Sequence, residues 1–229
     1  MNEQLDSAGL SSPGAESNRK KLLNLWLRRA AGTIAPPIDV AQRPSTLLLS
    51  YAQERLWFLE ELGHAGAAYN MPLSLRLTGV LDTDALEASL AELVRRHESL
   101  RTGFGSETGK PFQCIAPAVE MPLAVVDLTL LVATEQDAEV RRLVQAEVDT
   151  PFDFSADSLF RRKLLRLSGE SHILLMTMHH IVSDGWSLGV LVRELGALYE
   201  AYSQGRSSPL PEPRLQYADY ALWQRDWLN

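Results

Sequence analysis

Cysteine is almost absent from the 229-residue sequence, which contains only Cys114. A single thiol cannot form a disulfide framework, a CxxC redox pair or a cysteine-based zinc site. This scarcity excludes the small disulfide-stapled secreted folds and the cysteine-rich metal domains. The expected setting is the reducing cytoplasm.

The sequence also lacks an excess of basic residues and any long hydrophobic run. Its 22 Lys and Arg residues are outnumbered by 29 Asp and Glu residues, which gives a net charge of -7. Nucleic-acid-binding domains usually carry a basic patch, so nucleic acid is not an expected partner. No apolar run approaches the roughly 18 residues of a membrane span. Residues 1–17 do not have the charged-then-apolar order of a secretory signal.

Three parts are expected along the chain. Residues 1–17 contain too few apolar side chains to offset the entropy of ordering, which predicts a flexible tail. Residues 18–46 begin as a basic amphipathic helix and continue as a Pro-containing linker. That helix is a candidate docking element, and lying on a membrane surface is the alternative. Residues 47–229 are expected to form the folded body, because 45% of the sequence is hydrophobic.

The folded body is predicted to be α/β, a two-layer sandwich with a mixed β-sheet. Helices are expected over residues 50–62, 83–96, 133–148, 186–202 and 217–228, and strands over 70–78, 99–104, 111–115, 123–126, 159–167 and 172–179. Residues 168–171 (SGES) are typical of a hairpin turn between the last two strands. Residues 173–176 (ILLM) are apolar at both even and odd positions, so both faces of this strand are apolar, as in a central strand covered on both faces.

Two adjacent histidines close the last predicted strand. Because side chains alternate along a strand, His180 shares a face with Met178 while His179 points to the opposite side. The two rings therefore cannot readily chelate one ion, and no metal site is expected. Histidine titrates near neutral pH, which suits one of the pair to take a proton from an attacking amine or to orient it. A hydrogen-bonded structural role at the strand end is the alternative.

Residues 179–187 (HHIVSDGWS) resemble the HHxxxDG signature of condensation domains of nonribosomal peptide synthetases, a signature shared by chloramphenicol acetyltransferase-like acyltransferases. Three further segments resemble core motifs of condensation domains, in the family's order: residues 50–59 (SYAQERLWFL), 96–104 (RHESLRTGF) and 217–225 (YADYALWQR). The resemblance covers residues 47–229 and implies the amino-terminal lobe of the two-lobed, chloramphenicol acetyltransferase-like fold.

The resemblance implies a role for each residue of the signature. His180 would lie in a tunnel where an acceptor amine attacks a donor thioester, as general base or as a positioning group. His179 and Asp184 would be largely structural, with Asp184 in an ion pair with either Arg101 or Arg96.

Gly185 is expected to give the strand-to-helix turn its conformational freedom. By resemblance, it would also let a substrate approach the backbone, where its amide helps to steady the tetrahedral intermediate.

The implied function is amide bond formation between an acyl or peptidyl donor and an aminoacyl acceptor, with an L-to-L-like subtype. The substrates would be carried on phosphopantetheine arms of donor and acceptor carrier proteins, and no cofactor would be bound intrinsically. Neighbouring synthetase modules and a carboxy-terminal lobe are the other implied partners. Since the chain stops at Asn229, shortly after the fourth motif, it is expected to hold the catalytic motif without a complete active site.

Three alternatives remain open at this point. The chain could be a non-catalytic carrier-protein docking element that binds through residues 18–29. It could also be another HHxxxDG acyltransferase or an epimerisation domain. Heterocyclisation domains usually carry aspartates where His179 and His180 stand, so heterocyclisation is disfavoured.

Overall fold

A computed structural model of the chain describes residues 35–39, 42–63, 66–118, 122–155 and 158–228. Backbone contacts divide the chain into residues 1–37 and residues 38–229, and the second unit contains all the helices and strands described below. The expected tail at 1–17 and the expected basic helix at 18–31 lie outside the described residues.

A four-stranded sheet forms the centre of the second unit. Its order is β2 (Asn70–Thr78), β7 (Ser171–His179), β6 (Phe160–Ser168) and β5 (Ala124–Asp127). β7 runs antiparallel to both β2 and β6, whereas β5 runs parallel to β6. Ser168 pairs with Ser171 across the turn between β6 and β7. The predictions of an α/β fold, a mixed sheet and a hairpin over residues 168–171 are confirmed.

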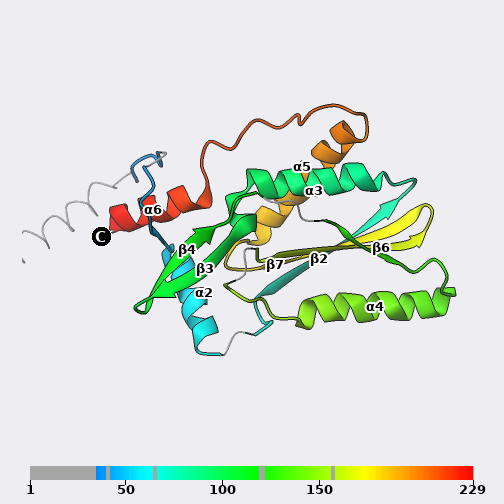
Figure 1. Ribbon diagram of the computed structural model, residues 1–229, viewed down its shortest axis with the longest axis horizontal. Helices are drawn as coiled ribbons and strands as arrows, with labels where there is room; N and C mark the ends of the chain where they lie inside the picture. The colour runs from blue at the N-terminus through cyan, green and yellow to red at the C-terminus, as the bar shows by residue number, and fades with distance from the viewer. Residues whose placement is uncertain (1–34, 40–41, 64–65, 119–121, 156–157, 229) are drawn as a thin grey trace, which may run out of the picture. The chain divides into compact units, whose positions relative to one another are not determined.

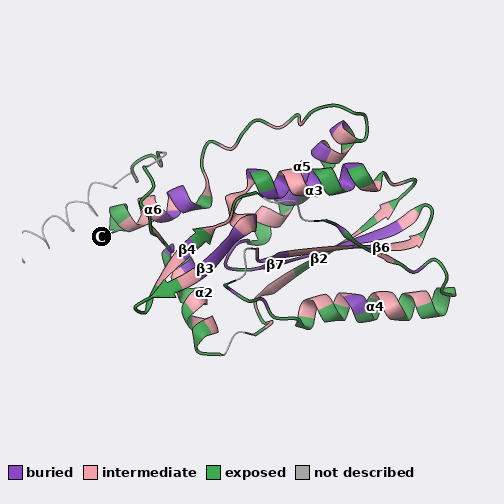
Figure 2. Cartoon of the chain, in the orientation of Figure 1, coloured by how far each residue is buried: buried purple, intermediate pink, exposed green. Residues whose placement is uncertain are grey.

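Helices cover both faces of this sheet. α3 (Thr83–Arg96) and α5 (Gly185–Tyr202) pack on one face, and α4 (Ala133–Asp149) packs on the other (Figure 1). The fold therefore has one layer more than the two that we expected. The reason is that β7 has buried side chains on both of its faces, so each face needs a covering layer (Figure 2). None of the described helices is long and apolar enough to cross a bilayer.

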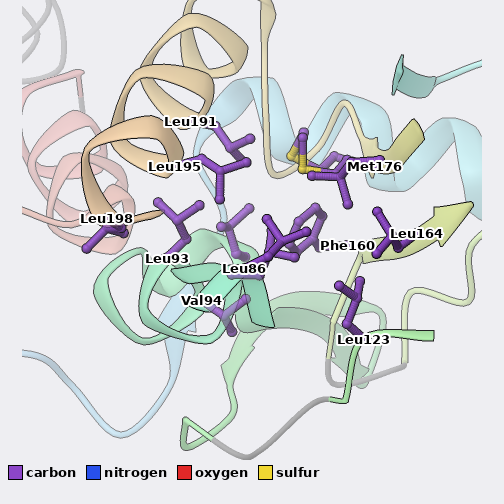
Figure 3. Packing of buried hydrophobic residues seen from close by; sticks show 14 residues of the cluster. Leu86, Leu93, Val94, Leu123, Phe160, Leu164, Met176, Leu191, Leu195 and Leu198 are labelled. Atoms are coloured by element: carbon purple, nitrogen blue, oxygen red, sulfur yellow. The ribbon is translucent and has the colours of Figure 1, made fainter. Parts of the chain in front are cut away.

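The largest of the three apolar clusters among the described residues lies between the sheet and the pair α3 and α5 (Figure 3). Even-numbered residues of β6 and β7 meet the apolar stripes of the two helices there; the labelled members are Leu86, Leu93, Val94, Leu123, Phe160, Leu164, Met176, Leu191, Leu195 and Leu198. Asp82 starts α3 by accepting a hydrogen bond from the Ala85 amide at 2.9 Å, as its position before the apolar stripe predicts.

A second, three-stranded sheet lies beside the end of β7. It has the order β1 (Leu47–Leu48), β4 (Lys110–Ile115) and β3 (Thr102–Glu107). Helix α2 (Tyr51–Glu61) follows β1. Buried Phe104 and Ile181 share an apolar cluster, so this sheet packs directly against the turn that follows β7.

The strand expected over residues 99–104 begins later than predicted. Residues Glu98–Arg101 form a 3-10 helix, η1, and β3 starts at Thr102. Two local hydrogen bonds stabilise this turn after α3. The Leu100 amide donates to the His97 carbonyl at 3.0 Å, and the Thr102 hydroxyl donates to the Glu98 carbonyl at 2.7 Å. These local bonds hold the segment in a helical turn, and the alternation of its side chains could not reveal them.

The last helix, α6 (Tyr217–Leu228), has the bounds that the sequence predicts. Its amino end lies against η1, and it also contacts β1. Tyr217, Tyr220, Trp223 and Trp227 form a row of ring contacts along it, with centroids 5.1 to 5.8 Å apart. The helix thus brings the fourth motif-like segment next to the second.

Replacing Leu174 with alanine is expected to lower the free energy of unfolding by about 2–5 kcal/mol, because this fully buried side chain would leave a cavity in the core. Urea unfolding of the purified chain measures the loss. Leu130→Ala is the matched control, since that side chain is 98% exposed and its removal should change stability by less than about 0.5 kcal/mol. Equal losses in the two variants would contradict this description of the core.

Candidate functional site

The candidate site is the turn between β7 and α5. β7 ends at His179, which is 1% exposed, whereas His180 is exposed. The His180 amide donates to the Tyr69 carbonyl at 3.0 Å, and the Val182 amide closes the turn by donating to the His179 carbonyl at 3.1 Å. Strand alternation predicts that the two rings point to opposite sides, and they do: the His179 ring is inside the fold and the His180 ring is at the surface.

His179 is enclosed by aromatic rings. Its imidazole meets the edge of Phe154 at 4.7 Å between centroids, with Tyr69 at 6.0 Å and Phe152 at 6.2 Å. Its Nδ1 accepts a hydrogen bond from the Ile181 amide at 3.1 Å. Burial, aided by the charge of His180, lowers the pKa of His179 from 6.5 to about 4. His179 is therefore a neutral structural residue that fixes the course of the turn.

His180 is held in one orientation by the turn that follows it. Its Nδ1 lies 2.7 Å from the Ser183 carbonyl oxygen. Since a carbonyl can only accept a hydrogen bond, this nitrogen must carry the proton. In the neutral ring the lone pair then belongs to Nε2, so the arrangement leaves His180 with one nitrogen prepared to accept a proton.

Asp184 caps helix α5. One of its carboxylate oxygens accepts hydrogen bonds from the Ser187 amide at 2.8 Å and from the Ser187 hydroxyl at 2.6 Å. These two bonds hold the pKa of Asp184 below its ordinary value, burial opposes them weakly, and the nearby His180 adds to the lowering. The residue is thus an exposed, ionised carboxylate at the start of the helix.

The expected ion pair of Asp184 with Arg96 or Arg101 does not form among the described residues. Arg96 donates to the carbonyls of Leu210 and Pro211 at 3.3 and 2.6 Å, and its Nε lies 3.6 Å from a Glu194 carboxylate oxygen. Arg101 donates to the Ala116 carbonyl and lies 3.9 Å from Glu98. Both guanidinium groups thus bind other partners and not Asp184. Asp184 holds the turn by capping α5, without an arginine.

Gly185 is the first residue of α5, and the expectation that its turn needs glycine freedom is wrong. Its φ angle is outside the left-handed region, and a Cβ added there would meet no other atom within 4 Å. The protein itself therefore tolerates a side chain at this position. The space beside Gly185 is open, as it is at most of the described glycines, so it does not by itself mark a site.

Gln53 is a buried contact of the turn that the sequence analysis missed. Its side-chain nitrogen donates to the Ile181 carbonyl at 3.4 Å, and its oxygen accepts from the Ser50 amide at 3.0 Å. The Ser50 hydroxyl in turn accepts from the Gln53 amide at 3.2 Å, which completes a capping box at the start of α2. The spacing of Ser50 and Gln53 could have predicted the cap, although not the contact with Ile181.

Polar contacts join the first and fourth motif-like segments. The Ser50 and Tyr217 hydroxyls lie 3.0 Å apart. Arg225 donates to the Leu49 carbonyl at 2.8 Å and pairs with Glu54. These contacts connect residues more than 165 positions apart in sequence.

A second set of contacts joins the fourth segment to the second. Gln216 accepts from the Glu98 amide at 3.1 Å and donates to the Arg96 carbonyl at 2.8 Å. Arg43 bridges the same two segments, with its guanidinium 3.0 Å from an oxygen of buried Asp219 and 2.7 Å from Glu98. Together with Gln53, these bonds assemble all four segments around the turn that carries His180.

A pocket of about 140 Å³ opens between η1 and the first two turns of α5. Apolar side chains and the Ser183 segment of the turn line it; its residues are His97, Ser99, Leu100, Met178, Val182, Ser183, Trp186, Ser187, Val190 and Leu191. His97 Nε2 donates a hydrogen bond to a Glu194 carboxylate oxygen at 2.7 Å.

Comparisons with known proteins agree with this arrangement. The family model described as "Condensation domain" matches residues 44–229. A linear gramicidin synthase of Brevibacillus parabrevis is 42% identical over 207 residues, which is 90% of this chain and 4% of the synthase. Chondramide synthase cmdD of Chondromyces crocatus is 46% identical over 202 residues, 87% of this chain and 5% of that protein. The chain therefore spans only a small part of the curated relatives it matches.

Among solved structures, the X-domain from teicoplanin biosynthesis superposes with a TM-score of 0.75 at 33% identity. The match covers 84% of this chain and 41% of that one. The first condensation domain of the calcium-dependent antibiotic synthetase, in complex with a substrate analogue, gives a TM-score of 0.65 at 26% identity and covers 73% of this chain and 40% of its own.

Lowering the pH from 7 to 5 is expected to reduce the free energy of unfolding by on the order of 1–2 kcal/mol through His179. Its pKa is about 4 in the folded chain and near 6.5 in the unfolded chain, so between these values the unfolded chain binds a proton that the folded chain excludes. Stability is therefore full above about pH 6.5 and declines as the pH falls toward 4. Urea unfolding at the two pH values measures the difference.

His179→Asn should lose most of this dependence, because its amide oxygen can still accept the Ile181 hydrogen bond but does not titrate. Some dependence should remain, since burial and the nearby Arg166 also lower the pKa of His172. His180→Gln is the matched control and should keep most of the decline. A decline in His179→Asn as large as in the unchanged chain would show that His179 is not buried in its neutral form.

Proposed function

Because this chain belongs to the condensation-domain family, we propose that it supplies the acyl-transfer histidine of an amide-forming enzyme, and that His180 is this residue. The reaction joins an acyl or peptidyl thioester to the amine of an aminoacyl thioester. Activity is expected when the chain acts together with the other lobe of the family's two-lobed fold.

The single observation that carries the proposal is the contrast between the two histidines. His179 is buried and neutral, with its Nδ1 committed to the Ile181 amide. His180 is exposed, and its bond to the Ser183 carbonyl presents Nε2 as a proton acceptor. With Nδ1 bound to a backbone carbonyl, Nε2 is the ring nitrogen that remains to meet a substrate.

The proposed step transfers one acyl group. The acceptor amine nitrogen attacks the donor thioester carbon, and a carbon–nitrogen bond forms as negative charge moves to the thioester oxygen. Nε2 of His180 accepts the proton that the nitrogen must lose, or holds the amine by the same hydrogen bond. Collapse of the tetrahedral intermediate breaks the carbon–sulfur bond, and the thiolate leaves with the proton.

The surrounding residues support this step in two ways. The carboxylate of Asp184 interacts electrostatically with His180, so it contributes a negative charge to the turn that carries the ring. The open space at Gly185, at the amino end of α5, allows a substrate oxygen to approach the Gly185 backbone amide.

The remaining partners follow from the proposed reaction. Donor and acceptor substrates would arrive on the phosphopantetheine arms of carrier proteins from neighbouring synthetase modules, with no cofactor held by the chain itself. The cytoplasm is the proposed location, in keeping with a single cysteine among 229 residues.

His180→Ala is expected to lower the rate of amide formation by at least ~100-fold, because it removes the proton acceptor or the group that orients the amine. The measurement combines the purified chain with a carboxy-terminal lobe and loaded donor and acceptor carriers, and follows the amide product by mass spectrometry. His172→Gln, at the other end of β7, is the matched control and should retain activity at pH 7. Amide formation that is equal in His180→Ala and the unchanged chain would refute the assignment.

Donors of L configuration are expected to react faster than their D epimers, because residues 50–59 and 178–187 resemble the L-to-L subtype. Parallel assays with donor carriers loaded with the two epimers of one residue test this. A preference for the D epimer would assign the chain to another subtype while leaving the role of His180 unchanged.

A further inference from the structure

We propose that the pocket between η1 and α5 is a subsite for the side chain of the acceptor amino acid, and that it accepts apolar side chains up to about the size of a phenyl ring. This inference rests on the proposed function. The subsite would determine which acceptor amino acids reach the reactive group of His180.

The floor of the pocket is apolar and its rim is polar. Leu100, Met178 and Leu191 are at most 5% exposed and belong to the main core, so the floor is rigid. Ser99 and Ser187 line it as well, and the indole of Trp186 is 82% exposed beside them. A pocket of this kind favours a ligand with an apolar end inserted and a polar end at the surface.

The volume limits what can enter. Pockets that hold a whole small molecule are usually at least about 300 Å³, whereas an apolar cavity of about 150 Å³ is enough to bind benzene. At about 140 Å³, this pocket fits one side chain of a larger substrate and not the substrate itself. Leucine and phenylalanine side chains are of the right size and polarity.

Ser183 connects the pocket with His180. Ser183 lines the pocket, and its carbonyl is the group that accepts the hydrogen bond from His180 Nδ1 at 2.7 Å. Val182, which precedes Ser183, and Ser187, in the first turn of α5, also line the pocket. The reactive nitrogen and the pocket are therefore positioned by the same few residues.

The acceptor is a better occupant than the donor because of where its side chain is attached. The acceptor amine, which His180 must contact, is bonded directly to the α-carbon that bears the side chain. The donor α-carbon is bonded to the thioester carbon and lies one bond further from that amine. A pocket adjoining His180 is thus within reach of the acceptor side chain first.

Filling the pocket provides the test. Val190→Phe inserts a ring from α5 and Ser99→Leu inserts a side chain from η1, so the two variants approach from opposite walls. Each should lower kcat/KM for leucyl- or phenylalanyl-loaded acceptor carriers by at least ~10-fold relative to glycyl-loaded carriers. Val192→Phe is the matched control, since Val192 lies on the same helix, is 37% exposed and does not line the pocket.

A binding measurement on the chain alone separates this inference from the proposed reaction. Leucyl-pantetheine amide should shift the NMR signal of the Trp186 indole N–H, identified with Trp186→Phe, more than glycyl-pantetheine amide does. Val190→Phe should abolish the difference. Binding of the leucyl probe by the chain, with no amide formed when the unchanged chain is assayed with a carboxy-terminal lobe and loaded carriers, would preserve the subsite and refute the proposed function.

Two other results would overturn the subsite and leave the proposed function standing. One is an equal loss of activity with all acceptors, glycyl included, in both pocket-filling variants. The other is a change in selectivity that follows the donor side chain instead of the acceptor side chain.

Discussion

Burial of a neutral imidazole at the end of β7 is the constraint on which the site depends. His179 is surrounded by Phe152, Phe154 and Tyr69, and charging it there would require removing a cation from water. Its Nδ1 therefore remains an acceptor and takes the Ile181 amide, which bends the chain out of the strand. This bend carries His180 outward and brings the Ser183 carbonyl to its ring. The buried histidine thus has a structural role, and that role orients the exposed histidine.

The four motif-like segments are held together in part by side chains that bond to backbone groups. Gln53 reaches the Ile181 carbonyl, Gln216 reaches the Arg96 carbonyl and the Glu98 amide, and Arg225 reaches the Leu49 carbonyl. Each bond fixes the course of the backbone of a distant segment without depending on that segment's side chains. Gln53 thus supports the turn directly from α2, and the other bonds hold η1 and α6 in place beside the start of α2.

Sequence periodicity predicted most of the elements because each has a strong local signal. The bounds of β2 and α6, the hairpin at residues 168–171 and the cap at Asp82 all follow from alternation, helical spacing or capping chemistry. η1 was missed because a 3-10 turn of four residues has no periodicity of its own. The partners of Arg96 were also unpredictable, since the carbonyls of Leu210 and Pro211 are more than 110 residues away and every carbonyl in the chain is an equal candidate.

The placement of Asp184 matters for the charge at the site. Had an arginine paired with it, the carboxylate would be neutralised and would contribute little to the field at His180. As a helix cap it is held instead by the neutral amide and hydroxyl of Ser187, and it stays an exposed anion. The turn that carries His180 therefore keeps a negative charge at the amino end of α5. Capping thus positions α5 and, at the same time, leaves the carboxylate charged close to the reacting histidine in the sequence.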